Sequence, residues 1–133
     1  MSVQALLAAA MVDALADHAA VADVVTGVFD APPVRAARPY AVVEEALLAD
    51  WSTKDMAGRE GVLAVLLYDG GERPVRLRAL AAAAEEAVEA MPRDLGEGWR
   101  LVTLALARSR IVREGEGRWA AMSEWRVRLL KES

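Results

Sequence analysis

Few residues of this sequence have the chemistry needed for acid–base catalysis or metal binding. His18 is the only histidine, and the chain contains no cysteine. A metal site or a nucleophile–base pair would therefore have to be built from carboxylates and hydroxyls alone. His18 lies near the carboxyl end of a predicted helix, where the helix dipole favours a basic side chain. We interpret His18 as a residue of the helix end, because the sequence shows no evident partner for it.

The carboxylates are a second candidate for chemistry, because paired carboxylates can exchange protons with a substrate. They form three clusters: Asp13 and Asp17; Glu44 and Glu45; and Glu85, Glu86 and Glu89. Most of them lie on the polar side of helical patterns, which favours a solvated surface. The glycines form neither of the common phosphate-binding patterns, GxxxxGK[ST] or GxGxxG. We therefore predict that the protein is not an enzyme and holds no cofactor or metal.

Arginine and tryptophan are concentrated between residues 99 and 130. The arginines are Arg100, Arg108, Arg110, Arg113, Arg118, Arg126 and Arg128. They either pair with acidic residues of a neighbouring subunit or face nucleic acid, and the net charge of −4 favours the first interpretation. The four tryptophans could stack on a base or a sugar, but in strand-like segments they are more often core or interface anchors. We predict a subunit interface that contains Trp119, Trp125, Arg126, Arg128, Trp51 and Lys54.

These residues need elements to position them, and the main one is a hairpin. Two strand-like runs flank a turn at residues 114–117, which contains two glycines. Along the second run one face carries Trp119, Ala121, Ser123, Trp125, Val127 and Leu129. Thirteen residues of strand span roughly 43 Å. A compact domain of this size does not need strands of that length, so we expect part of the hairpin to reach a neighbour.

The remaining segments predict helices and two further strands. Residues 2–18, with Ser2 as the N-cap, and residues 75–91, between Pro74 and Pro92, show helical spacing of apolar residues. Residues 40–48 and 62–68 read as strands, although the end of the first also fits a helix. We predict an α+β fold: a mainly antiparallel four-stranded sheet (40–48, 62–68, 101–112, 118–130), two helices on one face, and a long C-terminal β-hairpin.

Length and composition set the remaining limits. The 133 residues suggest a single domain over 1–133, and 28 alanines point to closely packed helices and a modest core. Neither the net charge nor the apolar runs indicate a nucleic-acid binder or a membrane-spanning segment. Residues 50–61 are polar and contain Gly58 and Gly61, so we predict a mobile loop that becomes ordered on contact with another subunit or a partner.

Taken in order, these segments resemble the small tail terminator, or tail completion, proteins of long-tailed phages and of phage-derived gene transfer agents. The resemblance covers nearly the whole chain and includes the apolar first helix, the strand at 61–69, the helix at 75–91 and the closing hairpin. The segments that carry it are Val28-Phe29-Asp30-Ala31-Pro32-Pro33, Arg38-Pro39-Tyr40-Ala41-Val42-Val43, Trp51-Ser52-Thr53-Lys54 and Arg113-Glu114-Gly115-Glu116-Gly117. The chain departs from the pattern at Tyr68, where similar proteins often have Trp, and at the hairpin turn, where Glu-Gly replaces Asp-Gly.

The resemblance implies an assembly protein that forms a homohexameric ring at the head-proximal end of a tail tube. Such a ring stops tube polymerisation and joins the major tail tube protein to a head connector or stopper. DNA passes through its lumen without specific binding, and no membrane or cofactor takes part. The protein would be cytoplasmic during assembly and then part of the phage or gene-transfer-agent particle. The alternatives are another head–tail connector, a stand-alone interaction module and a small carboxylate-based enzyme.

Overall fold

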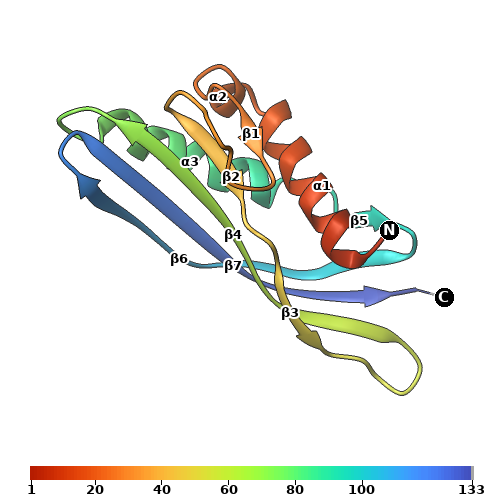
Figure 1. Ribbon diagram of the computed structural model, residues 1–133. Coiled ribbons are helices and arrows are strands. Elements are labelled where there is room, and N and C mark those ends of the chain that lie inside the picture. Colours follow the sequence, from red (N-terminus) through yellow and green to blue (C-terminus); the bar gives the residue numbers. More distant parts are fainter. Residues whose placement is uncertain (133) are drawn as a thin grey trace.

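The computed structural model describes residues 1–132, which contain three helices and seven strands (Figure 1). The helices are α1 (Val3–Asp17), α2 (Ala19–Ala22) and α3 (Val75–Glu89). The strands are β1 (Val28–Phe29), β2 (Tyr40–Val43), β3 (Leu47–Asp50), β4 (Ala57–Gly70), β5 (Asp94–Gly96), β6 (Trp99–Gly115) and β7 (Arg118–Lys131). All three helices lie on the same side of one curved sheet (Figure 1).

The sheet is built around β4 and β7, which pair antiparallel from Ala57 opposite Lys131 to Gly70 opposite Arg118. The strand order is β1-β2-β4-β7-β6-β5, and β3 also pairs with β4. All pairings are antiparallel except the short β1–β2 pair. The predicted hairpin is confirmed as β6–β7, with Gly117 in the left-handed conformation (φ 68°) at its turn. Because β4 pairs with β7 along this whole length, the hairpin is part of a broader layer and not a free two-stranded arm.

The predicted four-stranded sheet is wrong, because the sheet has seven strands. β1 and β5 contain only two and three residues, which is too short for a pattern of alternating residues to be recognised. The predicted strand 40–48 is divided at Glu44 and Glu45, which are exposed, into β2 and β3. Both parts pair with β4, because β4 is long enough to hold them one after the other. A third, short helix, α2, lies in the chain between the two that were predicted.

Half of the predicted loop 50–61 is strand, since β3 ends at Asp50 and β4 begins at Ala57. The glycines that suggested a loop serve a different purpose. A Cβ atom at Gly61 would lie 1.8 Å from the carbonyl oxygen of Leu47, so only glycine lets β3 approach β4 at this point. The connection between the two strands is therefore confined to residues 51–56.

Alternation along β7 explains how the sheet divides into a core face and an open face. Trp125, Val127 and Leu129 are buried against the helices, whereas Arg126 and Arg128 between them are exposed. α1 contributes Val3, Leu6, Leu7, Met11 and Leu15 to the core, and α3 contributes mainly leucine, alanine and valine. The face assignment made for this run is confirmed. None of the helices of residues 1–132 is long and apolar enough to cross a membrane.

The free edge of β6 is irregular. Its pairing with β7 shifts register at three places, between Leu101 and Thr103, between Leu106 and Arg108, and between Arg113 and Gly115. Such bulges bend a strand and interrupt the regular row of backbone groups at its edge. Beyond the short contact with β5, the long edge of β6 is therefore not a straight template for another strand.

Candidate subunit interface

The face of the sheet that points away from the helices is uncovered and mixes apolar and charged side chains. It contains Leu47 of β3, which is 74% exposed, and the partly exposed Val62 and Leu66 of β4. A hollow of about 660 Å³ crosses this face between β3 and β6; we call it the sheet groove. Its lining includes Leu47, Val62, Thr103, Ala105, Arg126 and Arg128.

Three side chains from two strands and a loop meet at one end of the sheet groove. The guanidinium of Arg128 lies 4.9 Å from the centre of the Trp51 ring, and its Nε atom lies 3.3 Å from Oε1 of Glu60. Trp51 begins the β3–β4 loop, and Glu60 faces Arg128 across β4 and β7. The structure therefore brings together two of the predicted interface residues, Trp51 and Arg128, which are far apart in the sequence. The third member, Glu60, was not among the predicted interface residues.

The other two predicted basic residues are available for contacts. Arg126 is exposed on the open face, and among residues 1–132 its side chain makes no hydrogen bond or ion pair. Lys54 lies in the loop between β3 and β4, away from Arg126, and is also exposed. A charged side chain that is solvated on one face and has an apolar hollow beside it is suited to pair with an opposite charge on a partner.

The two predicted tryptophans of β7 differ in how far they are buried. Trp125 has an exposed fraction of 0% and lies in the core of its own subunit, so it has no surface to offer to a neighbour. Its position on the same face as Val127 and Leu129 was the signal that should have placed it there. Trp119 is half-buried, and its Nε1 donates a hydrogen bond to the carbonyl oxygen of Gly71 at 3.1 Å. That bond fastens the start of β7 to the connection between β4 and α3.

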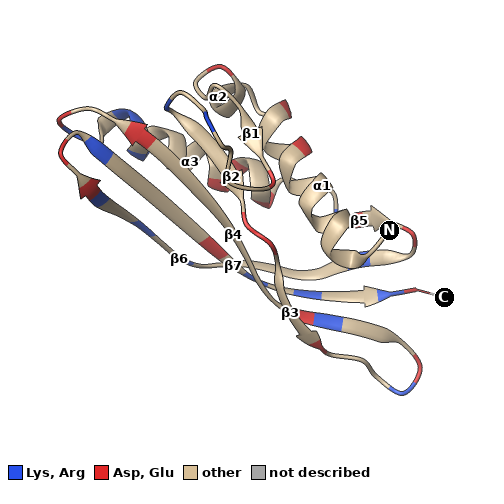
Figure 2. Cartoon of the chain, in the orientation of Figure 1, with Lys and Arg blue, Asp and Glu red and all other residues tan. Residues whose placement is uncertain are grey.

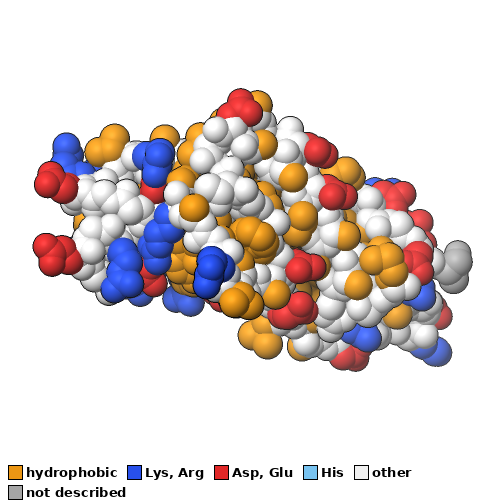
Figure 3. Space-filling view, turned by 45° about the horizontal axis from the view of Figure 1, so that its top comes forward, with side chains coloured by type: hydrophobic (Ala, Val, Ile, Leu, Met, Phe, Trp, Pro, Cys, Tyr) orange, Lys and Arg blue, Asp and Glu red, His pale blue; other side chains and the backbone are white. Residues whose placement is uncertain are grey.

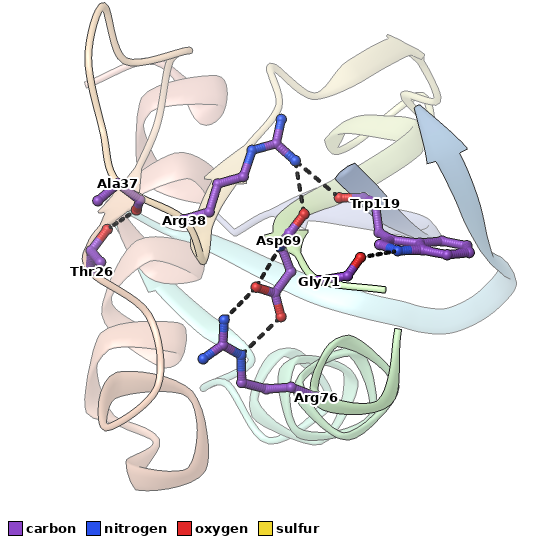
Figure 4. A network of polar contacts seen from close by, with 8 residues as sticks. Thr26, Ala37, Arg38, Asp69, Gly71, Arg76 and Trp119 are labelled. Atoms are coloured by element: carbon purple, nitrogen blue, oxygen red, sulfur yellow. Dashed lines mark hydrogen bonds and ion pairs between the residues drawn. The ribbon is translucent and has the colours of Figure 1, made fainter. Parts of the chain in front are cut away.

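A polar network beneath this end of the sheet was not predicted (Figure 4). The Asp69 carboxylate is 2% exposed and accepts hydrogen bonds from Arg76, including one of 3.0 Å from Nε to Oδ2. Arg38 donates from Nη1 to the backbone oxygens of Asp69 (2.9 Å) and Trp119 (3.3 Å), and it forms an ion pair with Glu114 at 3.3 Å. Arg38 therefore joins the segment before β2 to β4, β7 and the β6–β7 turn.

The hydrogen bonds and charges around the Asp69 carboxylate lower its pKa. Burial acts to raise the pKa, but the hydrogen bonds from Arg76 and from the N–H of Gly70, with the charges of Arg76 and Arg38, outweigh it. The pKa therefore lies below its ordinary value, and the group stays ionised. A carboxylate that is already satisfied by an arginine is not available as a general base.

His18 caps α1 and lies beside a second hollow of about 580 Å³ between α1 and α3. The sequence suggested no partner for it, but its Nε2 lies 3.9 Å from Oε2 of the exposed Glu86. The rim of this hollow also carries Asp13, Asp17 and Asp94. Within residues 1–132, no group of three or more His, Cys, Asp and Glu side chains is placed to hold a metal ion.

Comparison with known proteins gives this surface a context. The sequence model of the family described as "Tail completion protein gp17" matches residues 9–129. Among solved structures, the chain is similar to a chain of the "Virion of native gene transfer agent (GTA) particle", with 27% sequence identity and a TM-score of 0.72. That alignment covers 97% of this chain and 95% of the other. No curated protein sequence matches. These findings confirm the resemblance noted in the sequence.

Proposed function

Because the chain belongs to the tail completion protein gp17 family, we propose that it forms a homohexameric ring at the head-proximal end of a tail tube. The chain is a structural tail protein of a phage or a gene transfer agent, and not an enzyme. In the proposed ring it ends polymerisation of the major tail tube protein and offers a surface to the head connector or stopper. It would assemble in the cytoplasm and remain in the finished particle.

The family match over residues 9–129 is the observation that carries this proposal. The similarity to a chain of a gene transfer agent virion supports it, because the two chains correspond over nearly their full lengths.

The subunit has two unlike surfaces, a helix side and an open sheet side (Figure 1). Contacts between unlike patches of identical chains are heterologous, and they produce a closed ring when the rotation from copy to copy closes. Our candidates for these contacts are the exposed residues Lys54, Arg126 and Arg128 and the half-buried Trp51 and Trp119. Tryptophan and arginine are enriched at the energetic centres of interfaces. Trp125 is excluded because it is buried.

A ring of these chains would be acidic, since each copy has a net charge of −4. DNA carries one negative charge for about every 1.7 Å of its length, and proteins that hold it tightly do so with lysine and arginine. An acidic ring is therefore suited to let DNA slide through its lumen without specific binding. This part of the proposal rests on net charge.

Native mass spectrometry tests the ring, alone and with purified tail tubes. The expected species has six times the mass of the chain, and adding the protein to growing tubes should fix their length. The comparison variant has Arg126 and Lys54 both replaced by Glu. This change removes two exposed cations from the candidate interface. A wild-type chain that stays monomeric in both settings and leaves tube growth unchanged would overturn the proposal.

A further inference from the structure

The helix α1 is unusual because apolar residues surround it almost evenly. One side, with Leu7, Met11 and Leu15, is buried in the core. At 100° per residue, Ala5, Ala9, Val12 and Ala16 lie on the opposite side, where they are exposed or half-buried. A helix that is apolar on all sides is normally covered on all sides. By contrast, α3 follows the usual pattern, with buried Leu77, Leu80 and Val88 and an outer surface of charged residues.

The charge around α1 indicates what covers it. Residues 1–34 contain no lysine or arginine, and α1 carries Asp13 and Asp17, which are exposed one turn apart on the flank beside this outer side, at the rim of the hollow between α1 and α3. Figure 2 shows the acidic positions on α1 and the concentration of basic positions along the strands of the sheet. On the side of the molecule drawn in Figure 3, apolar and acidic side chains share the helix region, and several Lys and Arg side chains gather nearer the end with the β6–β7 turn. The surface that covers α1 should therefore carry both basic and apolar side chains.

The sheet groove has these properties. Its walls are Leu47 of β3 and the small residues Thr103 and Ala105 of β6, and its charged residues are Arg126, Arg128 and Glu60. β3 and β6 are separated by β4 and β7, so they lie three strand spacings apart, or roughly 14 Å. An α-helix with its side chains is roughly 10 Å across. The groove is therefore wide enough to receive a helix whose outer side carries alanine and valine.

The spacing of the charges also agrees. Asp13 and Asp17 are separated by roughly 6 Å along the helix axis. Arg126 and Arg128 are exposed on one face of β7 and are separated by roughly 7 Å along the strand. Within residues 1–132, the side chain of Arg126 makes no ion pair or hydrogen bond, and Arg128 pairs with Glu60 at an exposed position. Both arginines can therefore donate hydrogen bonds to a carboxylate from outside the subunit.

We infer that the outer side of α1 in one copy lies in the sheet groove of the next copy, with Asp13 and Asp17 facing Arg126 and Arg128. The helix and the groove are on opposite sides of the sheet, so one pair of copies leaves a helix and a groove unused. Each added copy repeats the contact until the chain of copies closes. This inference rests on the proposed ring and identifies the two surfaces that form it.

The contact can be tested with two charge-reversed variants that should assemble together but not alone. Only an interface between two different surfaces gives this result. One variant carries Asp13→Arg and Asp17→Arg, so its helix and its groove are both basic. The other carries Arg126→Asp and Arg128→Asp, so both of its surfaces are acidic. Each alone should associate at least about tenfold more weakly than wild type. An equal mixture should recover rings in which the two variants alternate, seen by native mass spectrometry as equal numbers of each.

Cysteine cross-linking gives a second measurement, because the chain has no cysteine of its own. Ala9→Cys lies on the outer side of α1 and Ala105→Cys lies in the sheet groove. The variant with both should give a ladder of disulfide-linked copies under oxidising conditions, and each single variant should not. In the matched control, Ala79→Cys on the exposed side of α3 replaces Ala9→Cys, and no ladder is expected.

The results separate this inference from the proposed function. Wild-type rings without the Ala9–Ala105 cross-link, or without recovery in the mixture, would overturn the inference and leave the ring intact. The same charge change on α3, Glu86→Arg with Glu89→Arg, should leave rings unchanged, and loss of rings there would point to α3 instead and overturn the inference. A wild-type chain that stays monomeric alone and on tail tubes would overturn both proposals.

Discussion

Arg128 and Trp51 lie against each other, with the guanidinium carbon 4.9 Å from the centre of the indole ring. Within residues 1–132, this is the only cation–π contact that joins the β3–β4 loop to β7. Glu60 holds the same arginine from β4 at 3.3 Å. The position of the loop is therefore linked to a residue that also lines the sheet groove, so a partner in the groove would affect the loop.

The first prediction is that Arg128→Ala loosens the β3–β4 loop. A cation–π contact at an exposed site contributes about 0.5–1 kcal/mol. Its loss should speed hydrogen exchange in residues 51–56 and leave the exchange of β4 and β7 unchanged. Arg126→Ala is the matched control, because it removes an arginine of the same face that does not contact Trp51. Equal exchange in the two variants would contradict the prediction.

The same loop should become better protected on assembly. In the free subunit, residues 52–55 are exposed, and their hydrogen bonds are mainly local, between Thr53 and Met56 or between Ser52 and its neighbours. We expect slow exchange there only in the ring or on a tail tube. Strong protection in the free subunit would show that the loop is already ordered.

The second prediction concerns the two exposed arginines of β7. Arg126→Glu together with Arg128→Glu should weaken assembly by about 2–5 kcal/mol if the pairs are buried in the ring. The subunit should remain folded, because exposed charges contribute about 0–1 kcal/mol to folding. Native mass spectrometry measures assembly, circular dichroism measures folding, and tail length provides the functional readout.

The control for this prediction reverses two arginines outside the candidate interface. Arg35→Glu with Arg73→Glu makes the same change in charge at exposed positions that form no ion pair within residues 1–132. It should assemble normally. A folded Arg126/Arg128 variant that still forms rings and still ends tails at the normal length would rule out an interface role for these arginines.

The third prediction is a loss of stability at low pH that depends on Asp69. Its pKa in the folded protein lies below the ordinary value of 3.8, so its contribution is complete above the pKa of the unfolded chain. That contribution is lost as the pH falls through the lower, folded-state pKa. Asp69→Asn should cost about 1.5–3 kcal/mol at neutral pH, the usual range for hydrogen bonds to charged groups. It should also flatten the acid side of the stability curve.

Urea unfolding between neutral pH and pH 2 measures this effect. Asp55→Asn is the control, because Asp55 is exposed and its carboxylate makes no ion pair within the described chain. The two variants should differ most at neutral pH and converge as the pH falls. An Asp69→Asn protein with the wild-type dependence on pH would show that the network does not carry this stability.

The fourth prediction separates the two tryptophans of β7. Trp125→Ala should cost about 3–5 kcal/mol, as for other large buried aromatic residues. Trp125→Phe should cost much less, because it keeps most of the ring and removes a buried Nε1–H that has no partner in residues 1–132. Trp119→Phe instead loses the hydrogen bond to Gly71, worth about 1 kcal/mol. Unfolding followed by circular dichroism measures these losses of stability. A Trp125→Phe variant as unstable as Trp125→Ala would contradict this account.

The fifth prediction is that His18→Ala changes little. The His18–Glu86 distance is 3.9 Å, and Glu86 is 77% exposed, so the pair should contribute less than about 1 kcal/mol. Assembly should be intact in the variant and in the presence of a chelator. A protein that loses assembly on chelation would show that a metal has a role after all.

The parts of the fold that could be predicted are those with a long regular pattern. The alternation from Trp119 to Leu129 gave the correct core face of β7, and the spacing in α1 and α3 gave both helices. Gly58 and Gly61 were misread because glycine favours a loop and also permits close approach of two strands, and the sequence cannot distinguish these uses. Strands of two or three residues depend on their neighbours, so they leave no pattern of their own.

The candidate site was predicted less well, for a related reason. Composition drew attention to Trp51, Arg126 and Arg128, whose role in an interface stays a prediction, but it did not indicate that Glu60 pairs with Arg128. Arg38, Asp69 and Arg76 come from three different segments, and only the folded chain brings them together. Trp125 was chosen as an interface residue because of its type, although its position in the alternating pattern already placed it in the core.

The bulged edge of β6 has a consequence for the time before assembly. In the proposed role, the free subunit has to persist until the tail tube that it ends reaches its final length. Straight free edges of neighbouring molecules can join into extended sheets, and such aggregation would remove the waiting pool. The three irregularities along β6 and the arginines beside them work against that joining. The edge of β6 therefore favours association through side chains over association through backbone hydrogen bonds, as the proposed ring would require.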